Sequence, residues 1–383
     1  MFHFQMFFSA LLTTFLLSCV QASPSSEFVG GVYAMSNNLD ANTMVVYARR
    51  RNGTLKLLDA ALSTGGKGAE INVGMGFDPL FSANSVVITP DNKFVLAVNA
   101  GSSSVSVLEV QPDFSLLLVH VQPVAGLGPT SIAVSGNLVY VSSPDADAAI
   151  QFSPDRRSLV VSDLFFGFNA LRTGTVNEIV VFSVDKFGHL STAPVSTATS
   201  TELNNAEGRN LPGEIGFEIV RSRDVQYVVV PEARGLAGAD GMSPADQVAS
   251  VSTWRLDSRG RLFPVQLDVP TGSSVTSGQV DSCRIEFSAD LRHFWVTNTP
   301  SNSISAFSFN RKISSLEEVA ATGTFPVDLW RSRDGKFLYP LFAGSVGAFE
   351  VSKGGRGAGL TLIQKPMNVP EMNAQGIVAF YLV

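Results

Sequence analysis

Charged side chains that stand within or just after apolar, strand-like runs are the residues of this sequence best suited to chemistry. Where two of them alternate with apolar residues, as Arg284 and Glu286 do, the alternation places both on one face of a strand. A second such pair is Glu214 and Glu218. The full set is Glu214, Glu218, Glu232, Arg234, Arg284, Glu286, Asp328 and Arg331.

These residue types suit acid/base chemistry on a small anion. A carboxyl group in a narrow channel of low dielectric acquires a perturbed pKa, and an arginine can bind a carboxylate through two parallel hydrogen bonds. We assign proton transfer to Glu232 or Glu218, and the binding of a substrate carboxylate to Arg234 or Arg284. We expect these four residues to face a common channel.

The same charges have a second interpretation. Arg284 with Glu286, and Asp328 with Arg331, would form buried cross-strand ion pairs that hold neighbouring sheets together. Such structural networks perturb pKa values as catalytic sites do, so the sequence leaves both interpretations open.

Other classes of chemistry find little support. Beyond residue 22, Cys283 is the only cysteine and His120, His189 and His293 are the only histidines, so no His/Cys cluster reaches the ligand count of a metal site. The glycine-rich run 65–68 lacks the strand-to-helix context of a phosphate-binding loop. We expect no metal and no other cofactor. The net charge of -6, without a basic cluster, argues against nucleic acid and anionic membrane as partners.

A recurring sequence pattern indicates which elements position the charged residues. It consists of an apolar strand, a turn with Asp or Gly, and a second apolar strand; the copies at 86–99 and 285–298 align without a gap. Shorter copies occur at 152–161, 220–229 and 330–339. A third strand and a fourth follow each copy. Repeats of roughly 40–50 residues with four short strands are typical of β-propeller blades.

Counting these units predicts an all-β, seven-bladed β-propeller of four-stranded antiparallel blades. The N-terminal unit has three strands and an orphan strand stands at 376–382, so we expect both chain ends to share one blade, which removes free sheet edges. The third unit stops at residues 143–147 after two strands. It is either a natural half-blade or the product of an incomplete gene model that lacks one hairpin.

The N-terminus predicts export. The apolar run 6–20, followed by Val20-Gln21-Ala22, is typical of a signal peptide over residues 1–22, leaving one propeller domain at 23–383. No Lys or Arg precedes the run, so an uncleaved anchor and a lipoprotein modified at Cys19 remain alternatives. We expect a secreted, extracellular monomer without membrane contact after cleavage.

Three motifs carry a resemblance to a known family: Ala97–Ser102 with Val105–Leu108, Gly128–Val134, and Val296–Thr299 with Ile304–Phe307. With them the chain resembles the lactonase-like seven-bladed propellers, which include bacterial 6-phosphogluconolactonase and the fungal enzyme that cyclises 3-carboxymuconate. The resemblance implies a lactone hydrolase or an intramolecular lyase that works without a metal. It also implies a site in the central funnel, built from His, Arg and Glu of several blades.

The sequence departs from that family where its histidines would stand. Gly128-Pro129-Thr130-Ser131 replaces a Gly-Pro-Arg-His-like stretch, a His-Pro-His motif is absent, and the three histidines fall in turns or an outer strand, where we expect surface residues. We therefore predict a lactonase- or muconate-cyclase-like protein for a small carboxylated lactone or its open-chain acid, using acid/base chemistry. The alternative is a non-catalytic propeller that binds a carbohydrate, a peptide or a surface partner, which the aromatic run 164–168 favours.

Overall fold

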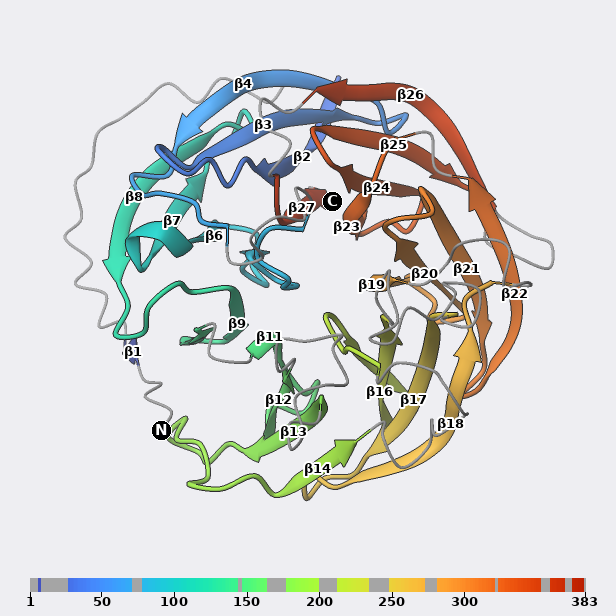
Figure 1. The fold of residues 1–383 in the computed structure, drawn as a ribbon. Helices are drawn as coiled ribbons and strands as arrows, with labels where there is room; N and C mark the ends of the chain where they lie inside the picture. The colour runs from blue at the N-terminus through green and yellow to red at the C-terminus, as the bar shows by residue number, and fades with distance from the viewer. Residues whose placement is uncertain are drawn as a thin grey trace, which may run out of the picture.

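The fold is an all-β ring of sheets around a central axis (Figure 1). The computed structural model describes residues 6–7, 27–70, 78–143, 147–163, 177–199, 212–233, 248–272, 281–320, 323–352, 359–368 and 374–381. Within these ranges no helix is long and apolar enough to cross a membrane. Because the antiparallel four-stranded sheets are arranged as a ring, the fold is a β-propeller with four-stranded antiparallel blades, as the sequence repeats predict.

Six four-stranded sheets form the blades, each with its strands in chain order from the axis outward, except that the last strand of the chain is innermost in the first sheet. The strands are β27 (Ile377–Tyr381), β2 (Phe28–Met35), β3 (Thr43–Arg50) and β4 (Leu55–Ser63); β5 (Val86–Ile88), β6 (Phe94–Asn99), β7 (Ser104–Val110) and β8 (Leu116–Pro123); β11 (Asp147–Phe152), β12 (Ser158–Asp163), β13 (Glu178–Ser183) and β14 (Ser196–Thr199); β15 (Glu218–Ser222), β16 (Val225–Glu232), β17 (Ser250–Leu256) and β18 (Leu262–Pro270); β19 (Ser282–Phe287), β20 (His293–Asn298), β21 (Ser303–Phe309) and β22 (Ile313–Ala320); and β23 (Pro326–Arg331), β24 (Phe337–Phe342), β25 (Ser345–Val351) and β26 (Leu360–Asn368).

The predicted count of seven four-stranded blades is wrong for the described residues. Between the second and the fourth unit stands a smaller sheet, in which β9 (Ser131–Ser135) pairs with β10 (Leu138–Ser142) and β10 pairs with β1 (Met6–Phe7). Only residues 143–146 separate β10 from β11, which is too short for two more strands. Whether this unit has lost an outer hairpin, and whether a gene model explains the loss, stay predictions.

The two ends of the propeller segment meet in the first sheet. Strand β27 pairs antiparallel with β2, from Gly30 opposite Tyr381 to Ala34 opposite Ile377. The remainder of the predicted signal peptide, residues 1–5 and 8–22, lies outside the described residues, and its cleavage stays a prediction.

Burial explains why the inner strands read as continuous apolar runs. Strand β24 is buried along its whole length, and β6 is buried from its second residue, because both faces of each sheet pack against the neighbouring blades. Strand β4, the outermost of its sheet, is exposed at seven of nine positions. Apolar clusters between adjacent sheets form the core, so the charges that remain near the axis stand out.

The repeated turn of the sequence is a hydrogen-bonded loop with the same contacts in four blades. In one example, the Ser288 hydroxyl donates to Asp290 Oδ1 at 2.7 Å, and the Asp290 carboxylate accepts the Arg292 amide at 3.1 Å. The hydroxyl also accepts the His293 amide. Equivalent contacts join Thr89 to Asp91, Ser153 to Asp155 and Ser332 to Asp334. Each turn thus fixes the register of one inner hairpin.

An asparagine at the end of the second strand ties adjacent blades together. Asn99 donates to the hydroxyls of Ser104 and Ser106 and accepts hydrogen bonds from Asn42 and Thr64. In the sixth unit of the chain, Asn298 makes the same pair of donations to Ser303 and Ser305. Each of these asparagines is therefore a structural residue of its blade, buried at the boundary between sheets.

Candidate functional site

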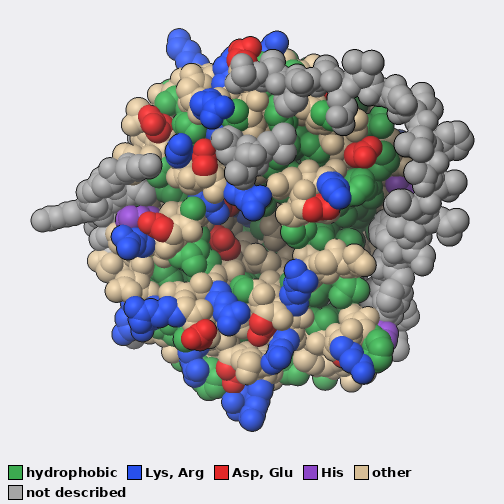
Figure 2. Space-filling view, turned by 180° about the vertical axis from the view of Figure 1, so that it is seen from behind, with side chains coloured by type: hydrophobic (Ala, Val, Ile, Leu, Met, Phe, Trp, Pro, Cys, Tyr) green, Lys and Arg blue, Asp and Glu red, His purple; other side chains and the backbone are tan. Residues whose placement is uncertain are grey.

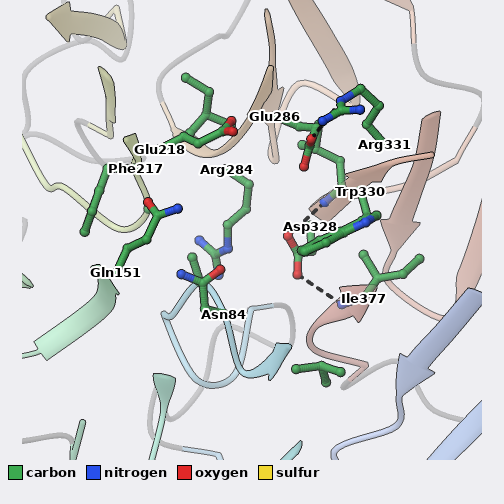
Figure 3. A pocket seen from close by; sticks show the side chains of 15 residues that line it. Asn84, Gln151, Phe217, Glu218, Arg284, Glu286, Asp328, Trp330, Arg331 and Ile377 are labelled. Carbon is green, nitrogen blue, oxygen red and sulfur yellow. Dashed lines mark hydrogen bonds and ion pairs between the residues drawn. The ribbon is translucent and has the colours of Figure 1, made fainter. Parts of the chain in front are cut away.

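The inner strands surround a cavity of about 220 Å³ near the axis. It is lined from β5, β11, β15, β19, β23 and β27 and from the segment before β5, so six sheets contribute to it (Figure 3). The lining residues are Ala83, Asn84, Val86, Gln151, Gly216, Phe217, Glu218, Arg284, Ile285, Glu286, Asp328, Leu329, Trp330, Arg331 and Ile377. Charged, amide and aromatic groups thus converge in one small space.

Glu218, the first residue of β15, is a carboxyl of the cavity lining whose pKa lies near neutrality. Its Oε2 atom accepts the amide of Phe287 from the neighbouring blade at 2.8 Å. Burial raises the pKa of Glu218 to about 7, and the charge of Arg331 opposes part of that rise. At neutral pH this carboxyl exists in both protonation states, which is what a proton-transfer group requires.

Glu286 and Arg331 form an ion pair across two blades, with 3.2 Å between Arg331 Nε and Glu286 Oε1. Arg331 Nε also donates to the carbonyl of Phe287, and its Nη1 donates to the carbonyl of Ser332 at 3.0 Å. Burial, and then the negative charge of Glu218, raise the pKa of Glu286 well above its usual value. The two glutamates therefore compete for one guanidinium group.

Arg284 is held from behind by the segment that precedes β5. Its Nη2 donates to Asp78 Oδ1 at 2.9 Å and to the carbonyl of Ser82, and its Nη1 donates to the carbonyl of Cys283 at 3.4 Å. Only 2% of Arg284 is exposed. Its Nε has no hydrogen-bond partner among the described residues, and an unsatisfied buried donor costs about 1–3 kcal/mol.

Asp328 in β23 accepts two backbone amides rather than a guanidinium group. Its Oδ1 accepts Leu329 N–H at 2.8 Å, and its Oδ2 accepts Ile377 N–H of β27 at 3.2 Å. Burial raises the pKa of Asp328 to about 6, although the charge of Arg284 and both amides lower it.

The ion pairs proposed from the sequence are therefore wrong in their partners. Arg284 pairs with Asp78 instead of Glu286, and Arg331 pairs with Glu286 instead of Asp328. Arg284 and Glu286 stand on the same strand, so each reaches a partner from a different segment.

The structure brings two of the four predicted site residues together. Glu218 and Arg284 both line the cavity. Glu232 ends β16, is 1% exposed, and accepts the hydroxyl of Ser250 at 2.5 Å; it is not among the lining residues. Arg234 lies outside the described residues, as does the aromatic run 164–168.

The three histidines are also away from the cavity lining. His120 in β8 and His189 in a turn are exposed, and His293, the first residue of β20, is half-buried. In the described part of the chain, no group of three or more His, Cys, Asp or Glu side chains is placed to hold a metal ion.

Sequence reasoning missed several residues of the site. Asp78 and Asn84 lie in the segment before β5, which contains no repeat and no motif, and Gln151 looks like an ordinary polar position of β11. The positive φ of 62° at Asn84 shows that this segment turns sharply there. Alternation with apolar neighbours, which singled out Glu218 and Arg284, is missing in the 78–84 segment.

Figure 2 shows the opposite side of the ring. Lys and Arg side chains lie interspersed with Asp and Glu side chains on this face, and acidic groups are visible near its middle.

Comparison with solved structures places the fold among known propellers. A putative 6-phosphogluconolactonase from Bacteroides fragilis has a TM-score of 0.62 at 14% identity, covering 92% of this chain and 98% of that one. A second one, from Bacteroides uniformis, has the same TM-score and identity over 91% and 99% of the two chains. The likeness shows the fold. A hypothetical selenium-binding protein from Sulfolobus tokodaii reaches 0.59 at 10% identity, over 92% and 95%. No family model matches the sequence, and no curated protein resembles it in sequence.

Proposed function

We propose that this propeller opens, or closes, a small lactone by acid/base chemistry in the central cavity, as a lactone hydrolase or a related intramolecular lyase. The observation that carries the proposal is Glu218, whose pKa of about 7 matches proton transfer at neutral pH, in a cavity that also contains Arg284. The likeness of the fold to two putative lactonases supports the same chemistry. The cavity lies below the roughly 300–1,000 Å³ of drug-sized sites, which suits a small substrate.

The proposed hydrolysis needs one base and one hydrogen-bond donor. Ionised Glu218 takes a proton from water as the water oxygen bonds to the lactone carbonyl carbon. The Arg284 Nε–H group donates to the oxyanion that develops on the carbonyl oxygen. The ring C–O bond then breaks, the carbonyl re-forms, and protonated Glu218 returns its proton to the departing ring oxygen. In an intramolecular lyase, a carboxylate oxygen of the open-chain substrate instead adds to a carbon–carbon double bond, and protonated Glu218 gives its proton to the neighbouring carbon, so that no water is taken up or released.

Replacement of Glu218 tests the proposal. We expect Glu218→Gln to lower kcat on a hydrolysable lactone by roughly 10²–10⁴-fold, the usual contribution of a positioned acid or base. Activity of the unaltered protein should rise with pH through about 7 as Glu218 ionises, and the variant should lose that rise.

The matched control is Glu350→Gln on β25, which removes an exposed glutamate from the outer part of a blade and should leave kcat unchanged. Equal activity of Glu218→Gln and the unaltered protein would contradict the role of Glu218. Absence of turnover on any lactone or on carboxymuconate would favour the alternative of a non-catalytic binding protein.

A further inference from the structure

The charges around the cavity do not suit an anionic substrate. Three carboxyl side chains and two guanidinium groups line it, and the guanidinium groups are those of Arg284 and Arg331. Both cations already have carboxylate partners, Asp78 at 2.9 Å and Glu286 at 3.2 Å. No Lys or His is among the lining residues.

More negative charge stands directly behind the lining. Asp78 and Asp281 are each 2% exposed, and Asp281 interacts electrostatically with both Asp78 and Arg284. Burial raises the pKa of Asp281 to about 6, with the negative charge of Asp78 adding to the rise. Carboxyl groups therefore outnumber the two guanidinium groups in this region. Protonation of Glu286 would remove one negative charge but would not supply a cation for a ligand.

The hydrogen-bonding groups of the cavity suit a neutral, hydroxyl-bearing ligand. Glu218, Glu286 and Asp328 are acceptors when ionised, and a ligand hydroxyl is a donor. Arg284 Nε–H is a donor without a partner among the described residues, and it matches a carbonyl oxygen. Gln151 accepts the Ile219 amide through Oε1, so its NH₂ group also faces a ligand as a donor. Phe217 and Trp330 add apolar wall.

We propose that the cavity selects an uncharged, hydroxylated lactone of the sugar-lactone class and discriminates against phosphorylated or carboxylated lactones. This inference rests on the proposed function and narrows its substrate, because the carboxylate clamp expected of Arg284 is already occupied by Asp78 and Ser82. Ring opening then converts the neutral substrate into a carboxylate in a cavity without a spare cation. The charge that forms favours release of the product.

Two pairs of small molecules test this selection at pH 8, where Asp328 is ionised. The first pair is gluconolactone and its 6-phosphate, compared by kcat/KM. The second pair is the corresponding lactams, which resist ring opening, compared by calorimetric binding. We expect the uncharged member of each pair to be favoured by about tenfold or more, because the phosphate group would be brought close to like charges.

Two variants link the selection to the named charges. Asp78→Asn frees the Arg284 guanidinium group, and Asp328→Asn removes a lining carboxylate. Each variant should shift the ratio of kcat/KM, or of binding affinity, toward the phosphorylated member of the pair by about tenfold. Because there are two variants, the test stays decisive if one of them does not fold. Glu350→Gln removes an equal charge from an exposed position and should leave the ratio unchanged.

The outcomes separate this inference from the proposed function. A higher kcat/KM, or tighter binding, for the phosphorylated member overturns the charge selection and leaves lactone chemistry intact. Binding of the neutral lactam without turnover of either lactone supports the selection and contradicts the proposed function. Equal binding of the two lactams, or binding of neither, overturns the selection.

Discussion

At the scale of single residues, burial rather than sequence neighbours sets the chemistry of the cavity. Glu218 and Glu286 share the field of Arg331, and the two carboxyl groups cannot both ionise as readily as free carboxylates. Burial raises the pKa of Glu218 to about 7, against the opposing charge of Arg331. The same shift makes a prediction about stability that is independent of any substrate.

The folded protein should lose stability through Glu218 as pH rises. A raised pKa in the folded state means that the folded chain holds a proton which the unfolded chain releases near pH 4.5. The contribution is present below that pH and disappears as pH passes about 7. Relative to Glu218→Gln, which cannot titrate, the unaltered protein should lose roughly 1–3 kcal/mol of unfolding free energy between pH 5 and pH 8.

Urea unfolding of both proteins at the two pH values measures this difference. In Glu350→Gln, where the lost carboxyl is exposed, the difference from the unaltered protein should be the same at both pH values. A difference between the unaltered protein and Glu218→Gln that does not change with pH would show that Glu218 titrates normally.

At the scale of elements, the repeated turn shapes each inner hairpin, but its four copies do not suit the backbone equally. The residue after the turn aspartate adopts a positive φ in all four: Asn92, Arg156, Leu291 and Gly335. Glycine adopts this left-handed backbone conformation without strain and asparagine tolerates it, whereas other residues are strained by about 1–2 kcal/mol. The copies at Arg156 and Leu291 therefore retain strain.

Replacing Arg156 by glycine should relieve that strain. Arg156 is exposed with a φ of 61°, so Arg156→Gly should raise the free energy of unfolding by up to about 1 kcal/mol, after the entropy cost of glycine is subtracted. Arg157, its exposed neighbour, is absent from the positive-φ residues, so Arg157→Gly should lower the same quantity by about 0.5–1 kcal/mol. Denaturant midpoints compare the two. The same sign of change for both would contradict the strain argument.

At the scale of the whole molecule, the packing of β27 connects the last strand of the chain to the first blades. Phe380 is 2% exposed and lies with its ring centroid 5.9 Å from those of both Tyr33 and Phe114. The amide of Ile377, in the same strand, is donated to Asp328 of the last blade. Through this one strand, residues at both ends of the propeller segment share a core, and the cavity gains part of its lining.

Truncation of Phe380 should test how much this packing contributes. We expect Phe380→Ala to lower the free energy of unfolding by about 3–5 kcal/mol, because a large buried ring leaves a cavity. Phe187→Ala removes a ring that is 63% exposed and should change it by less than about 0.5 kcal/mol. Thermal or urea unfolding measures both. A loss below about 1 kcal/mol for Phe380→Ala would show that the packing of β27 contributes little to the stability of the propeller.

The pattern along the chain was enough to determine the type of fold and two residues of the candidate site. Strand alternation and turn chemistry are local, so they mark the blades, and they singled out Glu218 and Arg284 on inner strands. The same local pattern counted seven units, and the third of them, which already stops after two strands in the sequence, forms a smaller sheet instead of a four-stranded blade. Secretion and cleavage after residue 22 remain predictions from the N-terminal pattern.

Only the tertiary structure decided which charges meet. Asp78 and Arg284 are 206 residues apart in the chain, and Glu286 pairs with an arginine of the next blade. The rotation of each blade about the axis brings these groups together. Packing between sheets sets that rotation, so it cannot be predicted from the spacing of residues within one strand. For the same reason Glu232 follows an apolar strand as a site residue would, yet contacts Ser250 outside the cavity lining.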